Sequence, residues 1–222
     1  HVISTSADDA HMMFPTDVDS DGDMDVLTAS ADDDKIAWYE NDGSQNFSEH
    51  VISDTADLAQ YVVGVDMDGD GDVDAVSASA GDKKIAWYEN DGSESFTEHV
   101  ISTTADGLNS VFAVDVDGDG DIDVLFAAQT EDKIAWYEND GSESFTPHTI
   151  STNADLATSV FAADVDGDGD MDVLSASGWD NKIAWYEHNA TPTLDSIDDV
   201  TIAEDAAEQT VNLAGISAGG GE

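Results

Sequence analysis

The chain has 222 residues, of which 51 are Asp or Glu and only 5 are Lys or Arg, so its formal net charge is −46. All five cations are lysines, and this excludes nucleic-acid binding and attachment to anionic membrane surfaces, both of which need clustered Lys and Arg. There is no cysteine for disulfides or thiolate-ligated metals, and no run of 18 apolar residues that would predict membrane insertion.

The chain is built from four tandem repeats with a period of 49 residues. The histidines that open the repeats keep this step, and no insertion or deletion interrupts it, as His1, His50, His99 and His148 show. The segment Lys-Ile-Ala-Trp-Tyr-Glu follows the same step at 35–40, 84–89, 133–138 and 182–187. The whole chain has 17 aromatic residues and regular Val- and Ile-rich runs, which argue against a disordered acidic chain.

Each repeat carries four strand signals and no helical period. In the third repeat these are 111–114, 124–128, 134–137 and 145–150, with an Asp/Gly loop after the first and an Asn-Asp-Gly-Ser turn after the third. Four short strands repeated every 40–50 residues are typical of β-propeller blades, whereas the repeats of a parallel β-solenoid, the main alternative, are shorter. We therefore predict an all-β fold of four-stranded blades over residues 1–189.

The strand Ile-Ala-Trp-Tyr-Glu alternates its side chains, with Ile and Trp on one face and Ala and Tyr on the other. Because blades bury both faces of their central strands, we expect the tryptophans to be core residues. Stacking on a sugar is the alternative role for Trp38, Trp87, Trp136 and Trp185.

One loop per repeat places five aspartates at alternate positions of nine residues, with Gly in the sixth place. These carboxylates repel one another unless a cation gathers them, and an all-oxygen ligand set without His or Cys favours Ca²⁺. We expect side-chain ligands at places 1, 3, 5 and 9 and a backbone carbonyl at place 7, whose side chain would turn to solvent. The candidate metal residues are Asp17, Asp19, Asp21, Asp23, Asp25, Asp66, Asp68, Asp70, Asp72, Asp74, Asp115, Asp117, Asp119, Asp121, Asp123, Asp164, Asp166, Asp168, Asp170 and Asp172.

About four calcium ions, one per repeat, would offset the negative charge and stabilise the fold. Calcium sites of extracellular modules have dissociation constants of about 0.1–1 mM and would be empty at cytosolic calcium concentrations. We therefore expect an extracellular protein, either secreted or on the cell surface.

These loops and strands resemble the FG-GAP/VCBS repeat family of calcium-binding β-propellers, as in residues 111–123 and the Lys-Ile-Ala-Trp-Tyr-Glu strand. The resemblance covers residues 1 to about 189 and implies calcium ligands at places 1, 3, 5 and 9, with no catalytic residue. Members include integrin α-chain propellers, bacterial adhesins, lectins and parts of polysaccharide lyases. Because family propellers usually have about seven blades, and the fourth repeat lacks its last strand, four repeats imply a partial propeller from a larger polypeptide.

The repeat pattern stops after His188. Residues 190–222 contain short β-like runs at 200–202 and 210–213 and resemble the opening of an Ig-like or cadherin-like module of bacterial surface proteins. We predict that this tail is a linker and an incomplete segment of such a module, because about 30 residues are too few to bury a core.

Residues that break the repeat are the candidates for recognition, and Tyr61 and Trp179 stand out among them. No Ser/His/Asp or Cys/His set emerges, and His1 is a repeat residue rather than a copper ligand.

We expect a non-enzymatic, calcium-binding repeat module for adhesion or scaffolding, with an unidentified protein or glycan partner. The alternatives are a carbohydrate-binding lectin-like propeller and an accessory part of a polysaccharide-degrading enzyme.

Overall fold

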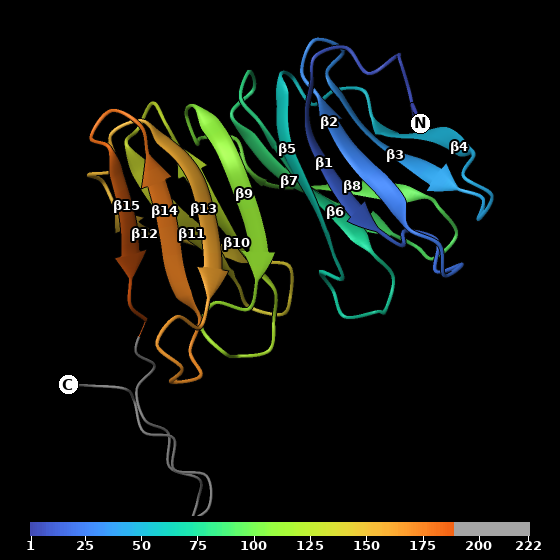
Figure 1. Cartoon of the computed structure of the whole chain (residues 1–222). Coiled ribbons are helices and arrows are strands. Elements are labelled where there is room, and N and C mark those ends of the chain that lie inside the picture. Colours follow the sequence, from blue (N-terminus) through green and yellow to red (C-terminus); the bar gives the residue numbers. More distant parts are fainter. Residues whose placement is uncertain (189–222) are drawn as a thin grey trace, which may run out of the picture.

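A computed structural model of the chain describes residues 1–188, which form a series of β-sheets placed side by side (Figure 1). Within these residues there is no helix of a length and apolarity that could cross a membrane. The strands are β1 (Ala10–Thr16), β2 (Asp25–Ser30), β3 (Lys35–Asn41), β4 (Phe47–Ser53), β5 (Ala59–Val65), β6 (Asp74–Ser79), β7 (Lys84–Asn90), β8 (Phe96–Ser102), β9 (Leu108–Val114), β10 (Asp123–Ala128), β11 (Lys133–Asn139), β12 (Phe145–Ser151), β13 (Ala157–Ala163), β14 (Asp172–Ser177) and β15 (Lys182–Tyr186).

Each repeat folds into one antiparallel meander, which we call blades 1 to 4 in chain order. Blades 1 to 3 have the orders β1-β2-β3-β4, β5-β6-β7-β8 and β9-β10-β11-β12, whereas the described residues of blade 4 form β13-β14-β15. The prediction of an all-β fold made of propeller blades is confirmed. The strand signals of the third repeat correspond to β9, β10, β11 and β12, each of which extends beyond its signal by one to three residues.

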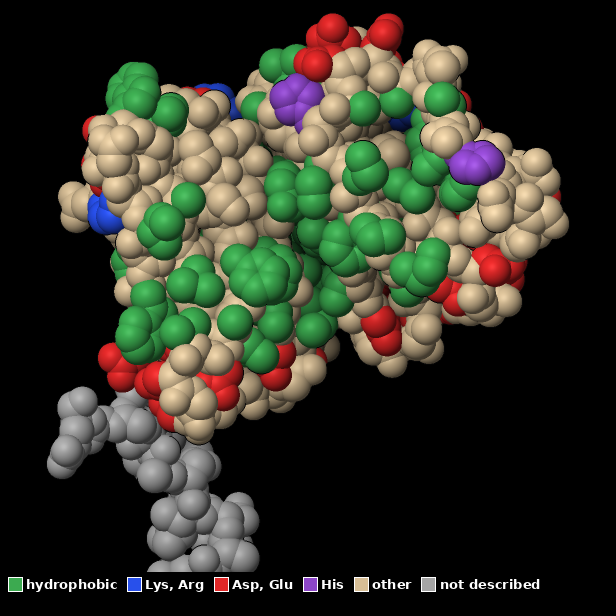
Figure 2. Space-filling view, in the orientation of Figure 1, with side chains coloured by type: hydrophobic (Ala, Val, Ile, Leu, Met, Phe, Trp, Pro, Cys, Tyr) green, Lys and Arg blue, Asp and Glu red, His purple; other side chains and the backbone are tan. Residues whose placement is uncertain are grey.

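The first strands of successive blades lie next to one another, so β1, β5, β9 and β13 form the inner side of the array. These four strands run in the same direction, and the loops that follow them therefore leave from the same edge, at the bottom of Figure 1. Blades 1 and 4 lie at opposite ends of the array (Figure 1). Hydrophobic side chains gather over the front strands, and acidic side chains gather toward the strand ends (Figure 2).

The blades pack through the two faces that the alternating strand predicts. Ile85 and Trp87 of blade 2 share a core with Ala135 and Tyr137 of blade 3. The same pairing of an Ile/Trp face with the Ala/Tyr face of the next blade occurs between blades 1 and 2 and between blades 3 and 4. The core role of the tryptophans is confirmed for Trp38 and Trp87, which are each 1% exposed and too buried to stack on a sugar.

Blade 4 departs from this pattern because no blade covers its Ile/Trp face among the described residues. Ile36, Ile85 and Ile134 are 0% exposed, but the equivalent Ile183 is 85% exposed. Trp185 is likewise 46% exposed. Identical residues at identical repeat positions therefore differ in burial through their neighbours alone.

The repeated histidines support the outer pair of strands in blades 1 to 3. His50, His99 and His148 stack on the tryptophan of the adjacent strand, with ring centroids 4.5, 4.4 and 4.7 Å apart. Each also shares a hydrogen bond through Nε2 with the glutamate that ends the Lys-Ile-Ala-Trp-Tyr-Glu segment. These contacts give the histidines a structural role.

The predicted linker and incomplete Ig-like or cadherin-like segment, residues 190–222, lies outside the described residues.

Candidate metal centre

The aspartate loops connect the first and second strands of each blade and share one edge of the array (Figure 1). In every loop the carboxylates of places 1 and 3 come together with a third carboxylate, and the candidate ligand atoms lie within 4.8 Å of one another. The third member is place 9 in blades 1, 3 and 4 and place 5 in blade 2. The groups are Asp17, Asp19 and Asp25; Asp66, Asp68 and Asp70; Asp115, Asp117 and Asp123; and Asp164, Asp166 and Asp172.

The aspartate of place 9 is the most buried residue of each loop. In blade 1, Asp25 Oδ2 accepts a hydrogen bond from the Val18 amide at 2.9 Å, and Oδ1 accepts one from the Asn41 amide at 2.8 Å. Equivalent pairs of hydrogen bonds recur at Asp74, Asp123 and Asp172. This carboxylate therefore ties the loop to the end of the third strand, and in blades 1, 3 and 4 it is also a member of the carboxylate cluster.

Hydrogen bonds inside the loop shape the turn around the carboxylates. The place 6 amide donates to the place 1 carboxylate, as Gly22 does to Asp17 Oδ2 at 3.0 Å. Gly22 has φ of +97°, a left-handed conformation that glycine adopts without steric cost. Place 4 is also left-handed, and Ser20 occupies it with φ of +61° where the other loops have glycine.

The sequence led us to expect that the place 7 side chains turn to solvent. In blades 1 to 3 each of them instead lies against a glycine in the turn between the third and fourth strands. Asp23 is half-buried and lies against Gly43, in the turn between β3 and β4. A Cβ atom at Gly43 would lie 2.4 Å from Asp23 Oδ2, so a larger residue there would push this carboxylate out of its present position. Asp72 and Asp121 make the same approach to Gly92 and Gly141.

The electrostatics of the loops favour a bound cation. Burial raises the pKa of Asp74 to about 6 and that of Asp123 to about 7, and nearby loop carboxylates add to the shift. Burial and neighbouring aspartates also raise the pKa of Asp68. A cation among these groups would favour their ionised forms and oppose the shift.

Unsatisfied oxygen atoms give a second test of fit. Asp17 Oδ1 and Asp168 Oδ2 are buried and accept no hydrogen bond within the described part of the chain. Buried carboxylate oxygens without a partner are costly, and a metal ion satisfies them directly. The residues present thus fit a hard divalent cation.

Asparagine residues at the end of the third strand contribute to the site in a way that sequence reasoning missed. Asn90 donates through its backbone amide to Asp74 of its own blade and through Nδ2 to the Val18 carbonyl of blade 1, at 3.2 Å. The repeated Asn-Asp-Gly signal was available, but we interpreted it only as a turn. At Asn90 it also links the loop of blade 1 to blade 2.

The two variable residues singled out from the sequence, Tyr61 and Trp179, lie on β5 and in the β14–β15 hairpin, outside the aspartate loops. Trp179 is 74% exposed at the β14–β15 hairpin, as expected for a surface contact residue. Tyr61 is only half-buried and packs against the core between blades 2 and 3. A small pocket of about 150 Å³ opens between the same two blades, and its lining includes Asp68, Asp121 and Glu143.

Comparison with known proteins adds a family and a fold. The model of the FG-GAP-like repeat matches residues 17–77, 66–126 and 115–175, which together span most of the chain. No curated protein matches the chain.

The solved structures that resemble the chain include an Agrocybe aegerita lectin, described as recognising non-reducing terminal N-acetylglucosamine. The sequence identity is 17% and the TM-score is 0.53, over 75% of this chain and 47% of the lectin chain. This chain therefore spans about half the length of that structure, and the similarity concerns the fold.

Proposed function

Because the chain belongs to the FG-GAP-like repeat family, we propose that it is a calcium-binding repeat module whose ions hold the blades in shape. The observation that carries this proposal is the fourfold recurrence of an all-oxygen carboxylate cluster within 4.8 Å. Places 1, 3, 5 and 9 would supply side-chain oxygens to each ion, and place 7 its backbone carbonyl. Calcium would neutralise charge and cross-link the loop to the blade.

We place the module outside the cell, in a secreted or cell-surface protein, where it would serve adhesion or scaffolding without catalysis. Millimolar extracellular calcium would fill sites whose dissociation constants are about 0.1–1 mM, whereas cytosolic calcium would not. The partner would be a protein or a glycan that contacts the loop edges, because loops carry most recognition on rigid scaffolds.

Equilibrium dialysis against radioactive calcium tests the metal proposal directly. We expect about four ions per chain at saturation, with half-saturation between about 0.1 and 1 mM. Binding of fewer than one ion per chain under these conditions would contradict it. Replacement of both Asp115 and Asp117 by Asn should remove one ion and leave the other three.

Glycan binding is the second candidate function, which the fold similarity to the Agrocybe aegerita lectin favours. Trp179 offers an exposed indole ring of the kind that stacks on sugars. A glycan array that includes terminal N-acetylglucosamine tests it with calcium present. We expect specific binding to weaken about tenfold or more in Trp179→Ala, since truncation of a tryptophan that anchors an interface costs about 2 kcal/mol or more.

Val100→Glu is the matched control for the glycan experiment, because Val100 is also exposed but lies on the outer strand β8. Its binding should equal that of the unchanged chain. If no glycan binds, this second candidate would be removed. If Trp179→Ala binds as well as its parent, Trp179 would not be the residue that stacks on the glycan.

A further inference from the structure

The two ends of the array are complementary to each other. We define the tail face as Leu174, Ala176, Ile183 and Trp185, on the Ile/Trp side of blade 4. We define the head face as Met13, Val26, Thr28 and Tyr39, on the Ala/Tyr side of blade 1. At all three internal junctions, the equivalent of the tail face packs on the equivalent of the head face.

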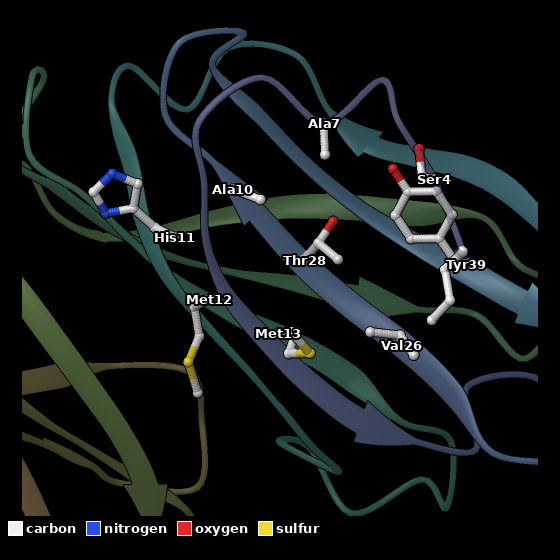
Figure 3. A pocket seen from close by; sticks show the side chains of 10 residues that line it. Ser4, Ala7, Ala10, His11, Met12, Met13, Val26, Thr28 and Tyr39 are labelled. Atoms are coloured by element: carbon white, nitrogen blue, oxygen red, sulfur yellow. The ribbon is translucent and has the colours of Figure 1, made fainter. Parts of the chain in front are cut away.

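Both faces are incompletely covered in the described chain. Ile183 is 85% exposed and Met13 is 68% exposed, whereas the equivalents of Ile183 in blades 1 to 3 are fully buried. The head face also borders a cavity of about 270 Å³ that Ile3, Ser4 and Ala7 line from the other side. Figure 3 shows that Met13, Val26, Thr28 and Tyr39 line this cavity together with Ser4 and Ala7 of the N-terminal segment. Under that segment Thr28 and Tyr39 are 8% and 4% exposed, so the head face is open mainly at Met13.

The ends also differ by one strand in a complementary way. Blade 4 lacks a described fourth strand beside β15, while residues 1–4 have the sequence His-Val-Ile-Ser, identical to residues 50–53 of β4. In blades 1 to 3 the histidine of this strand pairs in register with the tryptophan of the third strand. The same register on β15 would place His1 opposite Trp185, with Glu187 at the position of the glutamate that bonds each internal histidine.

We propose that two copies of this chain associate head to tail, with the tail face of one on the head face of the other. Residues 1–4 of the second copy would add to the β15 edge of the first as the missing outer strand. The N-terminus and β15 lie at opposite ends of the array in Figure 1, so residues 1–4 would meet the β15 edge of another copy rather than that of their own. They would leave the cavity that Ile3 and Ser4 now line, which would also uncover the head face. The internal junctions supply the contacts that this interface repeats.

Such an interface is heterologous, because the tail face of one copy meets the different head face of the other. A pair therefore keeps one free head face and one free tail face unless the assembly closes into a ring. The net charge of −46 opposes association. Association should therefore require saturating calcium and strengthen in about 1 M salt, where the screening length falls to about 3 Å.

Paired variants test the proposal by sedimentation velocity and light scattering, on the full 222-residue chain with His1 as its first residue. The unchanged chain should rise with concentration from 23.4 kDa to at least twice that mass. Ile183→Glu should disable the tail face and Met13→Glu the head face, because each would bury an unpaired carboxylate. Both substitutions are at exposed positions, so each variant should fold and remain monomeric alone.

The mixture of the two variants gives the decisive result. One intact head and one intact tail remain, so the mixture should form a 1:1 dimer and nothing larger. Val100→Glu, exposed to 53% on β8, should associate like the unchanged chain.

Three results would overturn the proposal. They are a chain that stays monomeric at every concentration, a mixture that does not dimerise, and a loss of association in Val100→Glu. A persistent monomer would leave the two faces to further repeats or to other residues of the same chain.

Discussion

Calcium should raise the melting temperature of this chain by about 20 °C or more relative to EDTA. A site filled at about 100 times its dissociation constant stabilises the fold by about 2.7 kcal/mol, so four sites contribute about 10 kcal/mol. For a chain of this size each kcal/mol corresponds to about 2–4 °C. The physical source is the relief of repulsion within the four carboxylate clusters. Thermal melts across a calcium titration, followed by circular dichroism, measure the shift.

Magnesium and two variants control this experiment. Magnesium should produce a much smaller shift, because it resists losing its waters to a flexible cage. Asp115→Asn combined with Asp117→Asn should remove roughly a quarter of the calcium effect, since one of four similar sites is lost. Asp54→Asn changes an exposed aspartate outside the loops and should leave the effect intact. Equal melting curves in calcium and EDTA would rule out a structural role for the ions.

Trp87→Ala should cost about 3–5 kcal/mol of unfolding free energy, the usual range for removal of a fully buried tryptophan. Trp87 is 1% exposed, packs between blades 2 and 3 and stacks on His99. Trp185→Ala removes the same residue from the same repeat position, but its side chain is 46% exposed. The loss of unfolding free energy there should be below about 1 kcal/mol. The Trp185 side chain is already half-exposed, so its removal gives up little buried apolar surface and leaves no closed cavity.

Urea unfolding in saturating calcium measures both variants, with dilute protein so that association between copies does not contribute. The comparison keeps the residue type and the repeat position the same. Trp185 differs from Trp87 in two respects within the described residues, because it lacks a neighbouring blade on its Ile/Trp face and it lacks the fourth strand whose histidine stacks on Trp87. Equal losses for the two variants would mean that blade-to-blade packing is not what buries Trp87.

The sequence predicts the blade closely because the same pattern of strands and turns occurs in four copies. The Lys-Ile-Ala-Trp-Tyr-Glu segment gives both the strand and its two buried faces, and the structure places Trp87 and Tyr137 in one core. The different fate of Trp185 was not predictable from its own repeat. It depends on whether another blade is present, and identical residues carry no information about that.

The site was predictable in composition but not in its connections. Alternating aspartates indicate an oxygen cage, and the structure brings places 1 and 3 together in all four loops. The hydrogen bond from the Asn41 amide to Asp25 spans 16 residues and depends on the register of β2 and β3. The approach of Asp23 to Gly43 likewise depends on how two loops meet, which no local pattern encodes.

The placement of the lysines makes proteolysis a report on individual blades. Lys35, Lys84, Lys133 and Lys182 begin the third strand of their blades, beside a tight hairpin, and each forms an ion pair with a nearby carboxylate. Lys83 adjoins the second of these positions. Cleavage by a protease that cuts only after Lys or Arg therefore requires local opening of a hairpin. Its successive cleavage points are one repeat apart, so the lengths of the first fragments identify which blade opened.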